Sequence, residues 1–357
     1  MTTGVVMLDF GGPQSAEELV PFLTELLQDV LPGPMWLRRI VAPRVASARS
    51  KRVQPDYERI GWSPVVPTHH RQVEALRLLI DPALPIASGM LFTPPTMDDA
   101  VAHLKAQGVE RIVAVPMFPH FSFATTGAAF NFLYQAMERA GCADMPVRWV
   151  PAYPEHPDYI AALVETIRAG LAATPGPVDE PIHLLFTPHG LPVSFVDRGD
   201  PYPEQIRASV RATVRALEWE GPYRVGWQSR LGPVQWLTPS TPEVLDQLAA
   251  EGCKRVCLVP ISFASEHVET LQEIDVEYRD HALHAGIPHF GRAPALGSEP
   301  RFIEALADLV THAVASLDRY SCVRCLMPKP EAHRRRKQCP SCHYKFPGWA
   351  QHGVTTP

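Results

Sequence analysis

The stretch TMDDAVAHLKAQGVERIVAVPMF, residues 96–118, recurs in altered form as STPEVLDQLAAEGCKRVCLVPISF, residues 240–263. Gly108 aligns with Gly252, and Arg111 aligns with Arg255. Each stretch begins with a Thr or Ser suited to cap a helix, continues as an amphipathic helix that the glycine ends, and then becomes an apolar strand that reaches Val-Pro. This internal duplication predicts two similar α/β halves.

The rest of the chain shows the same alternation of apolar runs and amphipathic stretches. Nearly continuous apolar runs are typical of strands buried on both faces, and strands that alternate with helices form parallel sheets. Strands are expected at residues 5–10, 86–92, 111–118, 147–153, 183–188, 223–228 and 255–263, and helices at 16–27, 70–79, 97–106, 203–218 and 241–250. We therefore predict two α/β halves, residues 1–155 and 156–320, followed by a short tail, residues 321–357.

The composition is that of a globular protein and argues against several other classes. Of the 357 residues, 46% are hydrophobic and 20% are charged, which is ordinary for a folded domain. The net charge of −5 argues against a general nucleic-acid binder. No apolar run is long enough to span a membrane, and the first residues lack the basic region of a secretory signal. The cysteines do not suggest a disulfide framework, so we expect a cytoplasmic protein.

An acidic stretch, SEHVETLQEIDVEYRD at residues 265–280, follows the second copy of the repeat. On an α-helix capped by Ser265, all of its acids except Asp275 share an arc of roughly 80°. A solvated face normally mixes both signs of charge, whereas a track for a cation explains why like charges are aligned at a cost of about 0.2–0.5 kcal/mol per pair. The stretch alone leaves the two interpretations even. The aligned acids are Glu266, Glu269, Glu273, Glu277 and Asp280.

His189 lies in FTPHGLP, residues 186–192, at the carboxyl end of another expected strand. A histidine after a strand is more often structural than catalytic, but the Gly, Leu and Pro that follow place this one on a shaped turn. A neutral imidazole accepts protons and binds metal ions near pH 7, and ligands of such sheets bind beyond the carboxyl ends of the strands. His189 and Glu269, facing each other across a cleft, suit a site that receives a divalent cation and takes up protons.

Residues 32–43, PGPMWLRRIVAP, combine apolar side chains with Arg38 and Arg39. This pattern fits an ordinary amphipathic helix, which we favour. It also fits a lip that touches a membrane surface or a flat apolar ligand. A peripheral membrane contact therefore stays open.

The chain resembles the ferrochelatase family, whose members insert Fe²⁺ into a porphyrin in haem synthesis. The likeness covers nearly all of residues 4–314 and rests on several long motifs in the same order. The resemblance implies two Rossmann-like, chelatase-type domains that enclose a porphyrin cleft. The motifs are LDFGGP (8–13), YERIGWSP (57–64), VPMFPHFSFATTG (115–127), FTPHGLPVSFVDRGDPYP (186–203), WQSRLGPVQWL (227–237) and SEHVETLQEIDVEY (265–278).

The resemblance also implies roles for single residues. The invariant histidine of the family falls on His189 and its metal-binding glutamate falls on Glu269, so these two residues are expected to bind the substrate Fe²⁺. The expected catalytic residues are His189, Glu269 and Glu273, and the acidic track continues through Glu266 and Glu277. The residues assigned to the porphyrin cleft are Phe10, Trp227, Trp236 and His267, although the sequence alone does not separate cleft tryptophans from core tryptophans.

Two departures from the family pattern bear on the substrate. Phe10 stands where one branch of the family carries a Tyr that ligates iron, and Leu91 stands where animal members carry an Arg. We therefore expect protoporphyrin IX as substrate and protohaem as product, with coproporphyrin III as the alternative. Two further functions stay open, that of a cobalt chelatase acting on an early tetrapyrrole and that of a non-enzymatic tetrapyrrole carrier.

The tail contains two CxxC pairs in SCVRCLMPKPEAHRRRKQCPSC, residues 321–342. Four thiolates suit tetrahedral Zn²⁺ or an iron–sulfur centre, and the spacing alone favours a zinc ribbon. The resemblance favours a [2Fe–2S] cluster, because some ferrochelatases hold one with C-terminal cysteines, and we expect this cluster with structural Zn²⁺ as the alternative. The expected ligands are Cys322, Cys325, Cys339 and Cys342.

Overall fold

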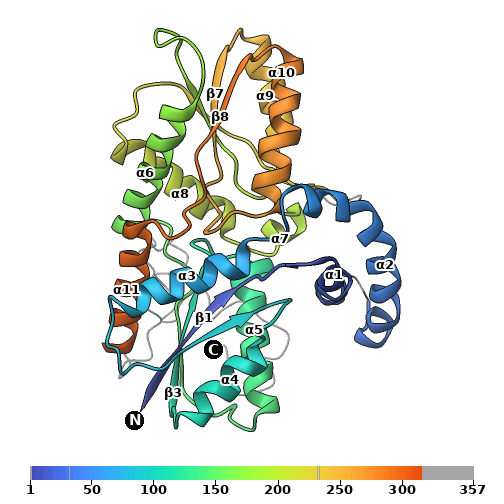
Figure 1. The fold of residues 1–357 in the computed structure, drawn as a ribbon, viewed down its shortest axis with the longest axis vertical. Helices are drawn as coiled ribbons and strands as arrows, with labels where there is room; N and C mark the ends of the chain where they lie inside the picture. Colours follow the sequence, from blue (N-terminus) through green and yellow to red (C-terminus); the bar gives the residue numbers. More distant parts are fainter. Residues whose placement is uncertain (1, 32, 231, 233, 316–357) are drawn as a thin grey trace.

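The computed structural model describes residues 2–31, 33–230, 232 and 234–315. Its strands form two four-stranded parallel sheets, which confirms the predicted fold class. Figure 1 shows the first sheet and its helices in the lower part of the molecule and the second sheet in the upper part. The first sheet has the order β2 (Ile86–Met90), β1 (Thr3–Asp9), β3 (Arg111–Pro116), β4 (Val147–Trp149); the second has the order β6 (Tyr223–Val225), β5 (His183–Phe186), β7 (Arg255–Val259), β8 (His289–Arg292).

Helices pack against both sheets, and α1 and α2 project together to one side of the molecule (Figure 1). Among the helices that the structure describes, none is long and apolar enough to cross a membrane. The helices are α1 (Ala16–Val30), α2 (Met35–Arg59), α3 (Val65–Arg77), α4 (Met97–Ala106), α5 (Ala128–Arg139), α6 (Pro157–Ala173), α7 (Val193–Asp197), α8 (Tyr202–Ala216), α9 (Thr241–Ala250), α10 (Arg279–Ala285), α11 (Pro300–Ala315) and the π-helices η1 (Phe123–Gly127) and η2 (Glu269–Tyr278).

The repeated stretches form the same unit in each half: α4 leads into β3, and α9 leads into β7. Thr96 and Ser240 each begin their helix with a capping box, in which the N-cap side chain and an acid three residues later satisfy one another's backbone N–H groups. Gly108 (φ +68°) and Gly252 (φ +86°) follow the two helices in the left-handed conformation that glycine adopts without strain. β3 and β7 then occupy the same place in their sheets.

One hydrophobic core joins the two halves. On β1, Val5 and Met7 face this shared core, whereas Val6 and Leu8 face a second cluster with α1 and α4, as the two-residue period of a strand requires. The helix α11 returns from the second half and packs against α3 and α6. The side-chain amide of Gln72 on α3 donates hydrogen bonds to the carbonyl oxygens of Ala264 (2.9 Å) and Gly297 (2.8 Å), which ties the first half to two loops of the second.

One expectation about local structure needs correction. The acidic stretch is not an α-helix capped by Ser265, because its helix begins at Glu269 and is wound as a π-helix with i→i+5 hydrogen bonds. Residues 35–43 form the start of α2, which continues to Arg59. The strand β8 was not among the expected strands. The boundary between residues 155 and 156 falls in the loop before α6 and stays a prediction, and the tail lies outside the described residues.

Candidate active site

His189 is held by backbone contacts just beyond β5. Its N–H donates to the hydroxyl of Ser262 (3.1 Å), and its carbonyl accepts from the hydroxyl of Tyr202 (3.1 Å). Its Nδ1 lies 2.7 Å from the carbonyl oxygen of Gly190. Because a carbonyl only accepts, Nδ1 carries the hydrogen in the neutral ring, and Nε2 keeps a lone pair for a metal ion or a proton.

Glu269 is the first residue of η2, close to the end of β7, and its carboxylate is hydrogen-bonded to Nδ1 of His267. Burial opposes ionisation of this carboxyl group, but the charge and hydrogen bond of His267 and the charge of His189 prevail and lower the pKa of Glu269 to about 2. Burial likewise opposes protonation of His267, yet Glu269, Asp9 and Glu273 raise its pKa above the usual value. The two imidazoles thus favour the ionised form of the Glu269 carboxylate.

Glu273 lies four residues further along η2 and has the opposite character. Burial, and then the negative charges of Glu269 and Glu277, raise the pKa of Glu273 to about 8, although a hydrogen bond donated by the hydroxyl of Ser229 acts in the other direction. The backbone N–H of Ser229 donates to the hydroxyl of Tyr278 (3.3 Å). Two neighbouring carboxyl groups with widely separated pKa values suit two roles, one as metal ligand and one as proton acceptor and donor.

Phe10 brings the first half of the molecule to this site. Its ring centroid lies 6.0 Å from that of His267 and 4.8 Å from that of Phe92. The sheet registers also make Phe10 the counterpart of His189. Val5 pairs with Val113 in the first sheet, and Leu184 pairs with Cys257, the equivalent of Val113, in the second. Phe10 lies five positions after Val5, and His189 lies five positions after Leu184. The same position therefore carries an apolar ring in one half and an imidazole in the other.

The two tryptophans assigned to the cleft have different surroundings. Trp236 is half-buried, and its ring centroid lies 6.5 Å from that of His189. Trp227 is 4% exposed and packs in the shared core beside Tyr202. Its assignment to the cleft is corrected accordingly: Trp227 is a core residue, because almost none of its surface is left for a ligand.

The structure separates Glu266 from the other acids of the track. Glu266 precedes η2, and its carboxylate accepts hydrogen bonds from Arg292 (2.9 Å) and from the N–H of Ala295 (2.9 Å). Glu277 is exposed and accepts a hydrogen bond from Gln272 (3.3 Å). The acids that follow one another towards solvent are therefore Glu269, Glu273 and Glu277, whereas Glu266 is engaged in an ion pair.

Two features near the site were not found from the sequence. Asp9 and His69 form a buried pair (Oδ2 to Nδ1, 3.1 Å), and Asp9 also accepts a hydrogen bond from the backbone N–H of Phe10 (2.7 Å). Tyr57 of α2 stacks on Trp62, and its pKa is raised by burial and by the charge of Glu269. Arg59, the last residue of α2, donates a hydrogen bond to Gln272 (3.3 Å), so the end of α2 lies against η2. In the sequence, Asp9 at the end of an otherwise apolar strand could have indicated the Asp9–His69 pair. The motif YERIGWSP could have indicated the position of Tyr57.

The described part of the chain has no group of three or more His, Cys, Asp or Glu side chains placed to hold a metal ion. Glu269 and His267 are hydrogen-bonded to one another, but with His189 they do not form a preformed metal centre. The four tail cysteines lie outside the described residues.

Solved structures share this fold. SirB from Bacillus subtilis with Fe³⁺ superposes with a TM-score of 0.54 at 13% identity, over 89% of this chain and 98% of that one. The sirohydrochlorin chelatase SirB from Bacillus subtilis subspecies spizizenii in complex with cobalt gives 0.50 at 12% identity, over 88% and 96%. The two parallel sheets thus have the α/β architecture of chelatases.

Sequence comparison identifies the family. The ferrochelatase family model matches residues 2–314. Ferrochelatase of Geotalea uraniireducens is 40% identical over 88% of this chain and 98% of its own length, and that of Synechocystis sp. is 37% identical over 93% and 87%. The chain belongs to the ferrochelatase family. It is a lyase that inserts a metal ion into a porphyrin in haem biosynthesis, with Fe²⁺ as substrate.

Proposed function

We propose that the chain inserts Fe²⁺ into protoporphyrin IX to form protohaem, with His189 and Glu269 as ligands of the incoming iron. The observation that carries this proposal is the buried carboxylate of Glu269, which is hydrogen-bonded to His267 and whose pKa is also lowered by the charge of His189. An anionic oxygen and an imidazole nitrogen replace part of the water shell of Fe²⁺. A divalent cation bound by Glu269 would also balance the negative charge of this buried carboxylate.

Insertion of the metal releases two pyrrole protons, which need acceptors in the site. Nε2 of His189 accepts a proton once the iron has left it for the porphyrin. The pKa of Glu273 of about 8 lets this carboxyl group exchange a proton near neutral pH. Glu277, exposed further along the same helix, then passes protons to solvent. We therefore propose proton exit as the task of the acidic track.

The apolar surroundings of the site support protoporphyrin IX as the substrate. Phe10 is half-buried, and its ring lies beside that of His267. Protoporphyrin IX has two vinyl groups where coproporphyrin III has two further propionates, and an apolar ring favours vinyl groups over carboxylates. Phe22, Phe92 and Leu91 are buried in the core next to Phe10 and bring no charge to this place.

We expect faster conversion of protoporphyrin IX than of coproporphyrin III. The measurement is an anaerobic assay with Fe²⁺ that follows the loss of porphyrin fluorescence for each porphyrin at matched concentrations. Faster conversion of coproporphyrin III would make that porphyrin the substrate instead. The cobalt chelatase is disfavoured by the match to ferrochelatases, and a non-enzymatic carrier is not compatible with membership of an enzyme family.

For the tail we propose a [2Fe–2S] cluster bound by Cys322, Cys325, Cys339 and Cys342. Four thiolates are the usual ligands of such a cluster, and the paired spacing in the sequence supplies them. We expect the purified full-length protein to be red-brown, with visible absorption that disappears on replacement of one cysteine, as in Cys339→Ser. A colourless protein that contains one equivalent of zinc would support the structural Zn²⁺ site.

We also propose that α2 makes a peripheral membrane contact from the cytoplasmic side. At its start, Met35, Trp36 and Ile40 are 46%, 65% and 51% exposed. Arg38 is tied to the end of α1 through the carbonyl of Gln28 (2.8 Å), whereas Arg39 is exposed beside the apolar residues. Apolar side chains next to a cation suit an anionic membrane surface.

The membrane contact predicts that Trp36→Ser with Ile40→Ser weakens binding to vesicles of phosphatidylcholine and phosphatidylglycerol. The measurement is co-sedimentation of the protein with the vesicles. Leu78→Ser is the matched control, because Leu78 is 85% exposed on a different surface. Equal sedimentation of the double variant and the wild type would rule out this surface.

A further inference from the structure

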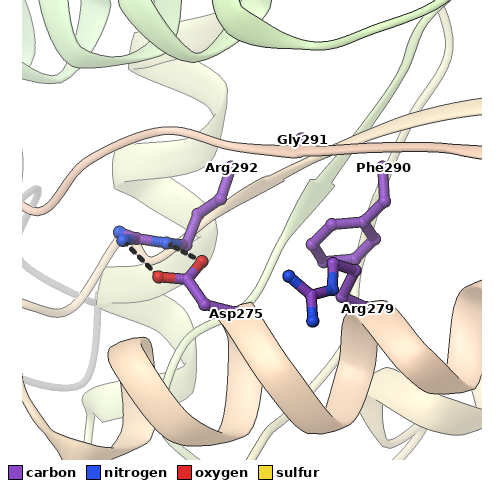
Figure 2. Close-up of a pocket in the computed structure, with 5 residues that line it drawn as sticks. All are labelled: Asp275, Arg279, Phe290, Gly291 and Arg292. Atoms are coloured by element: carbon purple, nitrogen blue, oxygen red, sulfur yellow. Dashed lines mark hydrogen bonds and ion pairs between the residues drawn. The ribbon is translucent and has the colours of Figure 1, made fainter. Parts of the chain in front are cut away.

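Arg292, the last residue of β8, forms ion pairs with two carboxylates that lie on either side of Glu269 in the sequence. Its Nη1 donates to Glu266 (2.9 and 3.1 Å), and its Nε and Nη2 donate to Asp275 (2.6 and 2.8 Å). Figure 2 shows the paired hydrogen bonds between Arg292 and Asp275, with Asp275 on the helix and Arg292 on the strand. One guanidinium group therefore joins the residues before η2 to the middle of η2.

The carboxylate of Glu266 is also hydrogen-bonded to the first turn of η2. Glu266 accepts a hydrogen bond from the hydroxyl of Thr270 (2.5 Å), and this hydroxyl oxygen accepts another from the backbone N–H of His267 (2.9 Å). Thr270 follows Glu269 directly, and His267 is the partner of the Glu269 carboxylate. Arg292, Glu266 and Thr270 thus hold the backbone on both sides of Glu269.

The ion-pair cluster is partly buried, most of all at its guanidinium group. The side chain of Arg292 is 13% exposed, and those of Glu266 and Asp275 are 27% and 36% exposed. A bidentate guanidinium–carboxylate pair in such surroundings has a defined geometry, which a flexible surface pair lacks. The cluster is therefore able to fix the rotation of η2 about its axis.

The first half of the molecule, to which no metal ligand is assigned, has a different residue at the position equivalent to Arg292. In the first sheet Trp149 of β4 pairs with Ala114, and in the second sheet Arg292 pairs with Leu258, which is the equivalent of Ala114. Trp149 and Arg292 therefore occupy equivalent positions in the two sheets. Trp149 packs on the ring of Phe130 (centroids 4.6 Å apart), and η1, the π-helix of this half, contains no acid. The guanidinium group occurs in the half whose π-helix carries Glu269 and Glu273.

We propose that Arg292 is a positioning residue for metal insertion: it sets the rotation of η2 so that Glu269 and Glu273 face the cleft. This inference rests on the proposed function, because it takes Glu269 as a ligand of the incoming iron. Both side chains with which Arg292 forms ion pairs belong to the segment that carries the metal ligand, so we expect an effect on the metal and none on the porphyrin.

Arg279 provides a matched control. Arg279 and Arg292 line the same pocket of about 400 Å³, where Arg292 pairs with Asp275 and Arg279 lies beside Phe290 (Figure 2). Arg279 is 50% exposed, and its ion pair is with Asp280 (3.4 Å), which is also exposed. Arg279→Gln removes a positive charge from the same pocket without loosening either carboxylate of the cluster.

The test compares Arg292→Gln and Arg292→Lys with Arg279→Gln in the anaerobic Fe²⁺ assay. Residues that orient metal ligands change metal affinity or activity by about 10- to 100-fold when replaced. We expect Arg292→Gln to raise the KM for Fe²⁺ by about that factor and Arg292→Lys to raise it less. Both variants should leave the KM for the porphyrin within about twofold of wild type. A loss of folded protein, by contrast, would lower only the apparent kcat. Arg279→Gln should behave as wild type. A wild-type KM for Fe²⁺ in Arg292→Gln would overturn the proposal.

A double variant separates positioning from stability. Arg292→Gln leaves unpaired carboxylates and is expected to lower the Tm, whereas Arg292→Gln with Asp275→Asn removes one of these charges and should restore much of the Tm. The KM for Fe²⁺ should stay raised in the double variant; its return to the wild-type value together with the Tm would show that Arg292 acts through stability alone. Glu269→Gln is assayed in parallel. If Glu269→Gln keeps full turnover, the proposed function fails, and if only the Arg292 variants resemble wild type, the positioning role of Arg292 fails alone.

Discussion

His189→Ala is expected to lower the rate of Fe²⁺ insertion by at least about 100-fold, because it removes a metal ligand and a proton acceptor together. Porphyrin binding should persist, since the aromatic cluster around Phe10 and the ring of Trp236 remain in place. The measurement combines the anaerobic insertion assay with a titration of porphyrin fluorescence in the absence of metal.

The control for His189→Ala is His281→Ala in the same half of the molecule. His281 lies on α10, is 37% exposed and pairs with Asp246 on the surface (2.8 Å), so its loss should leave turnover unchanged. Full turnover by His189→Ala would remove His189 from the mechanism. Loss of porphyrin binding in the same variant would mean instead that the imidazole holds the macrocycle.

Glu273→Gln is expected to lower the insertion rate by about 100-fold, the lower range for loss of a general acid–base group, and to change the pH dependence of stability. The pKa of Glu273 is raised from 4.5 to about 8 in the folded protein. Between these two values the folded state binds more protons than the unfolded chain, so this group makes wild-type stability fall as the pH rises from about 4.5 to 8. The variant has no such ionisation, so its Tm relative to wild type should increase over the same range.

The pH experiment compares Tm at pH 5 and pH 8 in metal-free buffer and adds a pH–rate profile for insertion. The wild-type rate should rise as Glu273 loses its proton, and this limb should be missing in Glu273→Gln. Glu165→Gln is the control, because Glu165 is exposed on a different helix, α6, and pairs with Arg168 on the surface. An identical pH dependence of both Tm and rate in wild type and Glu273→Gln would show that another group carries the proton.

Much of the candidate site was predictable because its residues sit at strand ends. His189 follows β5 and Glu269 follows β7, and these strands are neighbours in a parallel sheet, so their carboxyl ends meet at one edge. The rest was not predictable in this way. Whether a strand-end tryptophan is core or cleft depends on the elements that cross over it, which is why Trp227 is buried beside Tyr202 while Trp236 lies near His189.

By itself, the sequence determined the two duplicated α/β halves and the residues that line one edge of the second sheet. Helix caps, glycine stops and apolar runs are local signals, and they act within a few residues of one another. Only the tertiary structure decided that the acidic segment is a π-helix, that Glu266 is bound by Arg292, and that Phe10 of the first half lies against His267 of the second. Such features arise from contacts between residues far apart in the chain, and no periodicity in the sequence records them.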